Sequence, residues 1–322
     1  MSDRLPHAHS FHSVAAEHRH TVWDNAIPST IEVESGATVE LETADASGGQ
    51  LTPGSTAQDV ANMDMGNVNP VTGPVYVMGA EPGDTLQVEI LELTPNDWGW
   101  TAIIPHFGLL ADEFPDPWLN ISKVDGSTKT VRFNEHITLP FAPFPGTIGV
   151  APNEPGQHSV LPPTKWGGNM DIKHLTAGTT LYLPVAARGA LFSVGDTHAA
   201  MGDAEVCGTA VESAMTITVR LTTLRHQSIP YPQYRIPAGQ LANQAQTGYH
   251  VCTGIDPDLT EAAKQATRAM IAHIETTHGI DRQTAYAIAS VAVDLRIHEL
   301  VDAPNWVVGA FLPDSIFTEP GR

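Results

Sequence analysis

The sequence predicts a mainly β fold of the sandwich or barrel type, followed by a smaller α/β part that contains a helical hairpin. The prediction rests on short segments of alternating apolar and polar residues, on frequent turn residues, and on a late change to helical periodicity. The 25 prolines and 27 glycines among 322 residues supply the turns. We therefore expect a β-rich core at residues 1–225, carrying the active site, and an α/β portion at residues 226–322 packed on it.

The strand predictions come from apolar residues at every second position, bounded by turn residues. Residues 30–42 alternate in this way and are interrupted by Ser35 and Gly36, which predicts a hairpin. Further strands are expected at residues 75–78, 85–91, 128–133, 180–185, 215–221 and 307–312. The turn residues between them favour a sandwich or barrel over alternating βα units.

The last quarter of the chain has the apolar spacing of helices. Residues 227–254 lack periodicity and are expected to be an irregular segment that links two parts or pairs loosely with the sheet. Asp258, followed three residues later by Glu261, predicts a helix start, Gly279 predicts its end, and Asp281 predicts the start of a second helix. The apolar stripes are Leu259, Ala263, Ala266, Met270 and Ile274, then Ala285, Ile288, Val291 and Leu295. These stripes are interpreted as the core faces of the helical hairpin.

Composition and charge exclude several classes of partner. A net charge of −20, from 36 acidic and 16 basic residues, argues against nucleic acid and anionic membranes as partners. No apolar run of about 18 residues predicts a membrane span, and the histidine-rich first twenty residues do not resemble a signal peptide. The two cysteines imply no disulfide framework, so a reducing, cytoplasmic location is expected.

The densest group of ionisable residues lies at 195–205, directly after a largely apolar run. Asp196 and His198 are two residues apart, which on an extended strand places both side chains on one face. A carboxylate and an imidazole there would supply two metal ligands, with Glu205 available for proton transfer. The alternative is that these are polar residues at a strand end that hydrogen-bond a turn.

A second polar cluster follows a pair of glycines. Asn169 and Asp171 come directly after Gly167–Gly168, and they either line a pocket or form a hairpin turn with a side-chain hydrogen bond. His20 and His106 are isolated histidines, a type that is more often packed or exposed than a ligand.

These clusters, together with other motifs in the same order, resemble the acetamidase/formamidase family. The resemblance covers roughly residues 18–315. The matching segments are 69–77, 79–84, 98–100, 145–152, 167–171, 181–185, 189–199, 254–259 and 294–296. Two residues depart from the family pattern: Ala204, where Gly-Asp-Gly-Glu is usual, and His106, where a glycine commonly follows Pro105. Both departures are expected to narrow or reshape the pocket.

The resemblance implies a homo-oligomeric hydrolase, a dimer or larger, that converts formamide or acetamide to the carboxylic acid and ammonia. We expect a divalent metal ion, zinc, with calcium as the candidate at a second site. Such an ion polarises the carbonyl and lowers the pKa of water. Asp196 and His198 are expected to bind the ion, and Asp171 or His20 to complete its coordination.

The remaining roles in this hypothesis belong to three polar residues. Glu205 is expected to take a proton from water and pass it to the leaving ammonia, with Asp203 as a weaker candidate. Asn169 is expected to hydrogen-bond the amide or its oxyanion.

Two other functions stay open. One is hydrolysis of a different small nitrogen compound, and the other is a non-catalytic metal- or ligand-binding β-sandwich. The sequence has no phosphate-binding loop, dinucleotide-binding glycine motif or nucleophile-elbow serine. Cys207 is interpreted as a small strand residue rather than a nucleophile.

Overall fold

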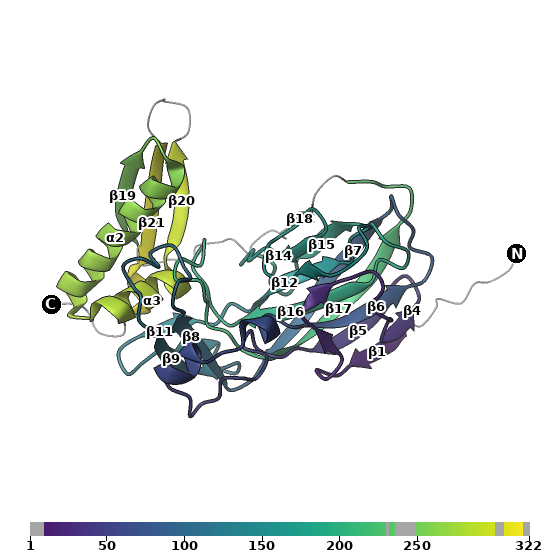
Figure 1. Cartoon of the computed structure of the whole chain (residues 1–322), viewed down its shortest axis with the longest axis horizontal. Helices are drawn as coiled ribbons and strands as arrows, with labels where there is room; N and C mark the ends of the chain where they lie inside the picture. The colour runs from purple at the N-terminus through teal and green to yellow at the C-terminus, as the bar shows by residue number, and fades with distance from the viewer. Residues whose placement is uncertain (1–9, 230–231, 236–248, 300–305, 318–322) are drawn as a thin grey trace, which may run out of the picture.

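Two bodies make up the molecule, a β-sandwich and a smaller C-terminal unit of helices on a sheet (Figure 1). The computed structural model describes residues 10–229, 232–235, 249–299 and 306–317. The mainly β class and the C-terminal helical pair predicted from the sequence are confirmed. None of the described helices combines the length and the apolar character needed to cross a bilayer.

The first sheet of the sandwich has six strands in the order β1-β5-β17-β7-β15-β18. Its strands are β1 (Phe11–Val14), β5 (Ala37–Glu42), β17 (Met215–Leu224), β7 (Thr85–Pro95), β15 (Thr180–Pro184) and β18 (Gln233–Arg235). Alternation explains the burial of β5, in which Ala37, Val39 and Leu41 are buried while the residues between them are more exposed. This face of the sheet packs on the second sheet.

The second sheet is the one that carries the polar cluster predicted from the sequence. Its order is β14-β12-β16-β6-β2, with β4 beside β6. The strands are β14 (Gly167–Asn169), β12 (Phe144–Val150), β16 (Phe192–His198), β6 (Val71–Val77), β2 (Arg19–His20) and β4 (Ile31–Val33). Every residue of β12 and β16 is buried, since these two strands are central and covered on both faces. Charged groups at the end of β16 therefore lie in the protein interior.

A third sheet, with several short elements, closes one end of the sandwich. Its order is β11-β10-β9-β8. The strands are β11 (Thr138–Pro140), β10 (Thr130–Arg132), β9 (Trp118–Asp125) and β8 (Trp98–Ile103). The short elements are β3 (Val22–Trp23) paired with β13 (His158–Ser159), α1 (Ala57–Ala61) and the 3-10 turn η1 (Met65–Asn67). Trp100 of β8 is buried in a small cluster with Leu51 and Val60.

The C-terminal unit places two helices beside a three-stranded sheet of order β19-β21-β20. Its elements are β19 (Tyr249–Asp256), α2 (Leu259–His278), α3 (Arg282–Ala292), β20 (Asp294–Glu299), β21 (Trp306–Pro313) and the 3-10 turn η2 (Asp314–Ile316). Asp258 accepts hydrogen bonds from the backbone N–H groups of Thr260 and Glu261, and Gly279 ends α2 in a left-handed conformation. The predicted caps of α2 are therefore confirmed.

Three details of the strand and helix predictions are wrong. Residues 30–42 form β4 and β5, but these strands pair in different sheets, because the chain crosses between the sheets at the turn that contains Gly36. Leu295 lies in β20 rather than in α3, which ends at Ala292. Residues 249–254 belong to strand β19, whereas 230–231 and 236–248 lie outside the described residues.

Helix α3 and the start of β20 hold the loop at residues 202–209, which contains Glu205. The Tyr286 hydroxyl donates to the Val206 carbonyl at 2.6 Å and accepts from the Leu110 N–H at 2.9 Å. The Gly202 N–H donates to the Ser290 carbonyl at 2.9 Å. Because these bonds are buried, they fix the loop firmly against the C-terminal unit.

A buried lysine joins the same loop to β20. Lys173 forms ion pairs with Asp294 and, at 3.4 Å, with Asp203, whose N–H also donates to Asp294 Oδ1 at 3.1 Å. Burial acts to raise the pKa of Asp294, but Lys173 together with the hydrogen bonds from Arg296 and the Asp203 N–H outweighs it, and the pKa is lowered. The ion pair is thus part of the packing between the two bodies.

We expect Lys173→Met to lower the free energy of unfolding by about 2 kcal/mol, because it removes one of the two cationic side chains that pair with the buried Asp294 carboxylate and leaves it Arg296 and the Asp203 N–H. Urea unfolding followed by fluorescence measures this change. Lys123→Met, at an exposed site on β9, is the control and should change stability by less than about 0.5 kcal/mol. Equal effects of the two substitutions would contradict a structural role for the buried pair.

Candidate active site

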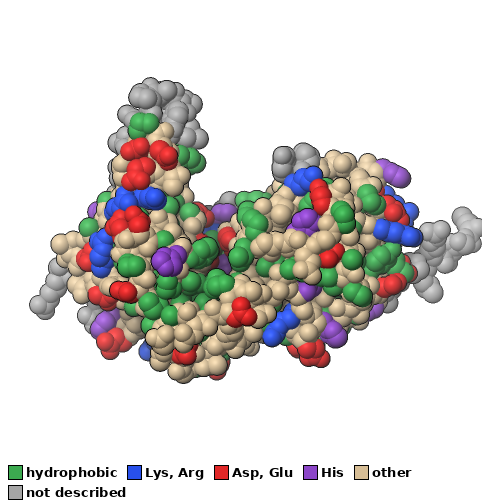
Figure 2. Space-filling model, viewed as in Figure 1, with side chains coloured by type: hydrophobic (Ala, Val, Ile, Leu, Met, Phe, Trp, Pro, Cys, Tyr) green, Lys and Arg blue, Asp and Glu red, His purple; other side chains and the backbone are tan. Residues whose placement is uncertain are grey.

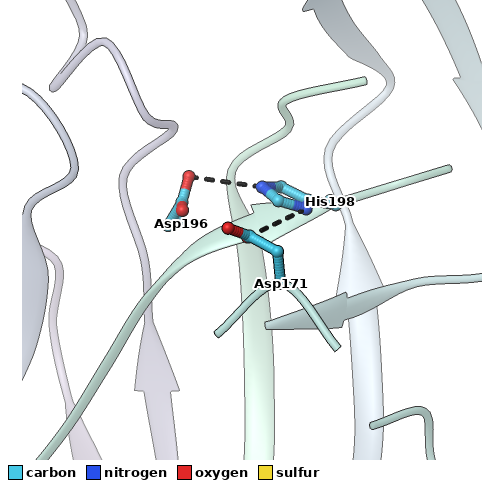
Figure 3. Close-up of side chains that lie close together, drawn as sticks. All are labelled: Asp171, Asp196 and His198. Carbon is cyan, nitrogen blue, oxygen red and sulfur yellow. Dashed lines mark hydrogen bonds and ion pairs between the residues drawn. The ribbon is translucent and has the colours of Figure 1, made fainter. Parts of the chain in front are cut away.

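His198, the last residue of β16, lies among four carboxylates. Its Nε2 atom is 3.1 Å from Glu212 Oε2, 3.4 Å from Asp196 Oδ1 and 3.8 Å from Glu205 Oε1. Its Nδ1 atom is 4.0 Å from Asp171 Oδ1. Figure 3 shows Asp196 and Asp171 each facing a different nitrogen of the imidazole ring. We call these five residues the carboxylate–histidine cluster.

The cluster is assembled from four separate segments by unusual backbone conformations. Asp171, Asp196 and Glu205 have φ angles of 48°, 50° and 42°, in the left-handed region that residues other than glycine seldom adopt. Such conformations concentrate at functional sites, where the surrounding structure maintains them. Ala204, which replaces the glycine of the family pattern, has φ 71°, a backbone conformation that favours glycine.

Glu212 was not predicted from the sequence, yet its side chain is among the most buried of the cluster. The backbone of Glu212 pairs with that of Trp100 on β8, with N–O distances of 2.8 and 2.9 Å. One signal could have identified it: Glu212 is the one charged residue in the otherwise uncharged segment 206–219. A buried carboxylate in such a segment needs a specific partner.

Gly146 of β12 makes room for the cluster. A Cβ atom at this position would lie 2.6 Å from Asp171 Oδ1, 2.7 Å from His198 Cε1 and 2.9 Å from the Asp196 carbonyl oxygen. The glycine is thus required by the close approach of three functional groups rather than by its backbone conformation.

We expect Gly146→Ala to reduce kcat/KM by about 10²-fold, because a displacement of about 1 Å in a catalytic group has an effect of that size. Steady-state kinetics on the folded variant measures it. Gly54→Ala is the control, since a Cβ there meets only Thr52 Oγ1 at 4.0 Å. A rate for Gly146→Ala equal to that of the control would show that the packing around the cluster does not matter for activity.

Neutral polar residues orient the carboxylates. Asn69 Nδ2 donates to Asp196 Oδ2 at 3.0 Å, so the segment directly before β6 supports the cluster. The Thr147 hydroxyl lies 2.6 Å from Asn169 Oδ1 and 3.2 Å from Asp196 Oδ2. Because Thr147 holds the amide oxygen of Asn169, the NH₂ group of Asn169 is the part left to donate to a ligand.

Burial and mutual repulsion raise the pKa values of the carboxylates. Burial raises the pKa of Asp171 to about 7, that of Glu205 well above its ordinary value, and that of Glu212 as well. Burial acts to lower the pKa of His198, but the charges of Glu212 and Asp196 outweigh it, and the pKa is raised well above its ordinary value. Four carboxylates around one imidazole thus repel one another unless protons or a cation neutralise them.

The donor set suits a divalent cation. Asp171, Asp196 and His198 form one group whose ligand atoms all lie within 4.8 Å of one another, and His198, Glu205 and Glu212 form a second. Asp171 Oδ1, His198 Nδ1 and Glu212 Oε2 are buried without a hydrogen-bond partner. Imidazole and carboxylate ligands are those of zinc and related ions, which coordinate buried nitrogen and oxygen atoms that have no hydrogen bond.

The cluster opens into two adjoining hollows. A cavity of about 340 Å³ is lined by Asn169, Asp196, Glu205 and Glu212 together with a largely apolar wall. A wider groove of about 800 Å³ between the sandwich and the C-terminal unit also reaches Asn169 and Glu205, and it includes Asp171. Figure 2 shows the deep hollow that separates the two bodies. Small molecules can therefore reach the cluster from solvent.

Two residues of the predicted site are not brought to the cluster. His20 uses both ring nitrogens elsewhere, with Nδ1 2.7 Å from the Val22 carbonyl and Nε2 3.0 Å from Ser193 Oγ. Asp203 is only two residues before Glu205, but its side chain lies on the other side of the loop and pairs with Lys173. Asp171, Asp196, His198, Glu205 and Asn169 do come together.

His106 and Cys207 also lie near the cluster without joining it. His106 has φ 68° and lines the wider groove, so a histidine occupies a backbone conformation that favours the glycine of the family pattern. Cys207 is fully buried, and its burial raises the pKa of the thiol to about 11, which makes it unsuited to nucleophilic attack.

Known proteins resemble this chain over nearly its whole length. Residues 8–160 and 153–319 match the model of the Acetamidase/Formamidase family. The formamidase of Methylophilus methylotrophus is 26% identical over 92% of this chain and 89% of its own. The gamma lactamase from Delftia acidovorans superposes with a TM-score of 0.86 at 27% identity, over 94% of this chain and 90% of its own. The acetamidase from Bacillus halodurans superposes with a TM-score of 0.66 at 30% identity, over 93% of this chain and 96% of its own.

Proposed function

The chain belongs to the acetamidase/formamidase family, and from this premise we propose that the carboxylate–histidine cluster is where it hydrolyses small linear amides. The products are the carboxylic acid and ammonia. The observation that carries the proposal is the convergence of His198 with two buried carboxylates, Asp196 and Glu212, and two partly buried ones, Asp171 and Glu205, beside a cavity that Asn169 also lines. A purely structural ion site would not need as many ionisable groups open to a cavity.

We propose Asp171, Asp196 and His198 as the residues that hold a divalent ion, and zinc as that ion. When bound, such an ion polarises the amide carbonyl and lowers the pKa of water. Glu212, 3.1 Å from His198 Nε2, holds the imidazole in orientation or serves as a further ligand. The calcium expected at a second site stays a prediction.

Glu205 and Asn169 have roles that follow from their positions beside the cavity. Glu205 accepts a proton from the attacking water and returns it to the nitrogen that leaves as ammonia. Burial raises the pKa of Glu205, which makes its carboxylate a stronger base toward water. The NH₂ group of Asn169 donates to the carbonyl oxygen as negative charge develops on it.

The direct test is ammonia release by the purified chain from formamide and acetamide. Turnover of either amide supports the proposal, and its absence, in a folded protein with its metal verified, overturns it. A protein that retains metal for folding but turns over no amide or related nitrogen compound would instead be a binding β-sandwich.

Cyclic amides are a second candidate substrate. The structure of the gamma lactamase from Delftia acidovorans superposes with a higher TM-score, 0.86, than that of the acetamidase, 0.66. Opening of a lactam ring needs the same attack on a carbonyl carbon but releases no ammonia. Appearance of the ring-opened amino acid from a γ-lactam, measured beside acetamide hydrolysis, distinguishes the two candidates.

We also propose a cytoplasmic homo-oligomer. Cys207 and Cys252 are free thiols, as is usual for proteins of a reducing compartment. Light scattering of the purified chain measures the oligomeric state.

A further inference from the structure

Resting on the proposed amidase function, we propose that the preferred substrate is a neutral amide whose acyl group is an apolar chain of several carbons. The acyl chain would lie along an apolar wall of the smaller cavity, beside the carboxylate–histidine cluster. The residues of this wall, which we call the acyl wall, are Met63, Met65, Val68, Trp100, Ile104 and Leu161.

The first argument is the size of the cavity. Its volume of about 340 Å³ is roughly eleven times the ~30 Å³ that one water molecule occupies in the liquid. It falls in the range of cavities that hold ligands much larger than formamide or acetamide, roughly 300–1,000 Å³. Formamide has only three non-hydrogen atoms and acetamide four, so either would leave most of the space to water.

The second argument is that polar atoms along the cavity, away from the cluster, already have partners. The Trp100 indole N–H and the Ser47 hydroxyl both donate to Asp45 Oδ1, at 3.0 and 2.5 Å. The Thr209 hydroxyl donates to the Ala102 carbonyl at 2.8 Å. These groups therefore do not need a hydrogen bond from the substrate. A polar acyl group would lose its own hydrogen bonds to water on entering the cavity.

The third argument is charge. Among the described residues that line this cavity there is no Lys, Arg or His, whereas Asp196, Glu205 and Glu212 are all acidic. An acyl group with a carboxylate would be repelled by these side chains and would find no Lys, Arg or His among the lining residues to pair with. The surroundings thus select a neutral, apolar group.

Burial of the substrate's acyl chain along the acyl wall should raise kcat/KM for amide hydrolysis. Each methylene transferred from water to an apolar surface is expected to increase kcat/KM by about fourfold. Hexanamide has four methylenes more than acetamide, so full burial predicts a gain of about two orders of magnitude.

The test is a series of primary amides, formamide, acetamide, butyramide and hexanamide, with kcat/KM measured from ammonia release. We expect kcat/KM to rise along the series. A maximum at formamide or acetamide, followed by a steady fall, would overturn the acyl wall while leaving the amidase function intact. Absence of ammonia from every amide would overturn the proposed function itself, so the two failures are distinguishable.

Near-isosteric substitutions in the acyl wall provide a second test of the proposal. The double variant Met65→Gln, Leu161→Asn should reduce the ratio of kcat/KM for hexanamide to that for acetamide by about tenfold. The control is Met78→Gln, Leu91→Asn. Met65 and Leu161 are 47% and 39% exposed, and Met78 and Leu91, which do not line the cavity, are 36% and 38% exposed. A ratio that changes equally in both double variants would overturn the proposal.

Discussion

Replacing Glu205 by glutamine is expected to reduce kcat for amide hydrolysis by about 10²- to 10⁴-fold. Glutamine keeps the shape of the side chain and its place beside the cavity, but it cannot accept a proton from water. The leaving nitrogen of an amide must be protonated to depart as ammonia, so the loss affects both halves of the reaction. Steady-state ammonia release measures the change, and circular dichroism verifies the fold.

The metal content of the purified Glu205→Gln variant shows whether the substitution has removed proton transfer or metal coordination. Glu205 also belongs to the second group of candidate ligands, with His198 and Glu212. Lost activity with retained metal supports proton transfer, whereas loss of the metal together with activity would assign Glu205 to coordination instead. Glu135→Gln, at a side chain that is 84% exposed, is the control and should keep the wild-type rate. A near-wild-type rate in Glu205→Gln would rule out the proposed role.

Removal of the proposed divalent ion is expected to produce the second large effect. Dialysis against a chelator should reduce ammonia release to the level of the uncatalysed control, and added zinc should restore it. Without a cation the four carboxylates around His198 repel one another, so the thermal midpoint should also fall, by roughly 5–10 °C for a site nearly saturated with metal. Elemental analysis verifies the removal.

A substitution in the cluster separates this effect from damage by the chelator. His198→Gln should lose the metal and the activity, since His198 belongs to both candidate groups. His136→Gln, at a side chain that is 74% exposed, should retain both. Full activity in protein verified to be free of metal would contradict a catalytic ion and leave the buried carboxylates to act alone.

The two bodies of the molecule act together in this scheme. The loop that carries Glu205 belongs to the sandwich, but Tyr286 and Ser290 of α3 bond its backbone on either side of that residue. The left-handed backbone at Ala204 and Glu205 depends on such bonds, because the isolated chain would disfavour it. The C-terminal unit thereby positions the proposed proton carrier.

Part of the site could be predicted from the sequence because the residues are close in the chain. Asp196 and His198 are two residues apart at the end of a strand and lie 3.4 Å from each other, although Asp196 has a left-handed φ of 50° instead of the extended backbone assumed in the prediction. Asn169 and Asp171 follow glycines that have positive φ angles, and Asn169 lines the cavity, as the first alternative predicted. The glycine pair belongs to strand β14 instead of a hairpin turn, and the Asn169 side-chain oxygen accepts from Thr147 on the neighbouring strand β12.

Other residues of the site could not be assigned from spacing. Asp203 and Glu205 are two residues apart, like Asp196 and His198, yet one pairs with Lys173 and the other faces His198. The left-handed turn at Ala204 and Glu205 removes the regular alternation of a strand, so the spacing does not predict the direction of either side chain. His20, in turn, is held by Ser193 on the neighbouring part of the sheet.

The sequence by itself determined the β-rich class, the capped helices and the motif at the end of β16, because these depend on periodicity, turn residues and hydrogen bonds within a few residues. Only the tertiary structure decided that β4 and β5 pair in different sheets and that Glu212 enters the site through backbone pairing with Trp100. These outcomes depend on contacts between residues more than 35 apart in the chain, for which no local pattern exists. The same long-range packing formed the apolar cavity beside His198.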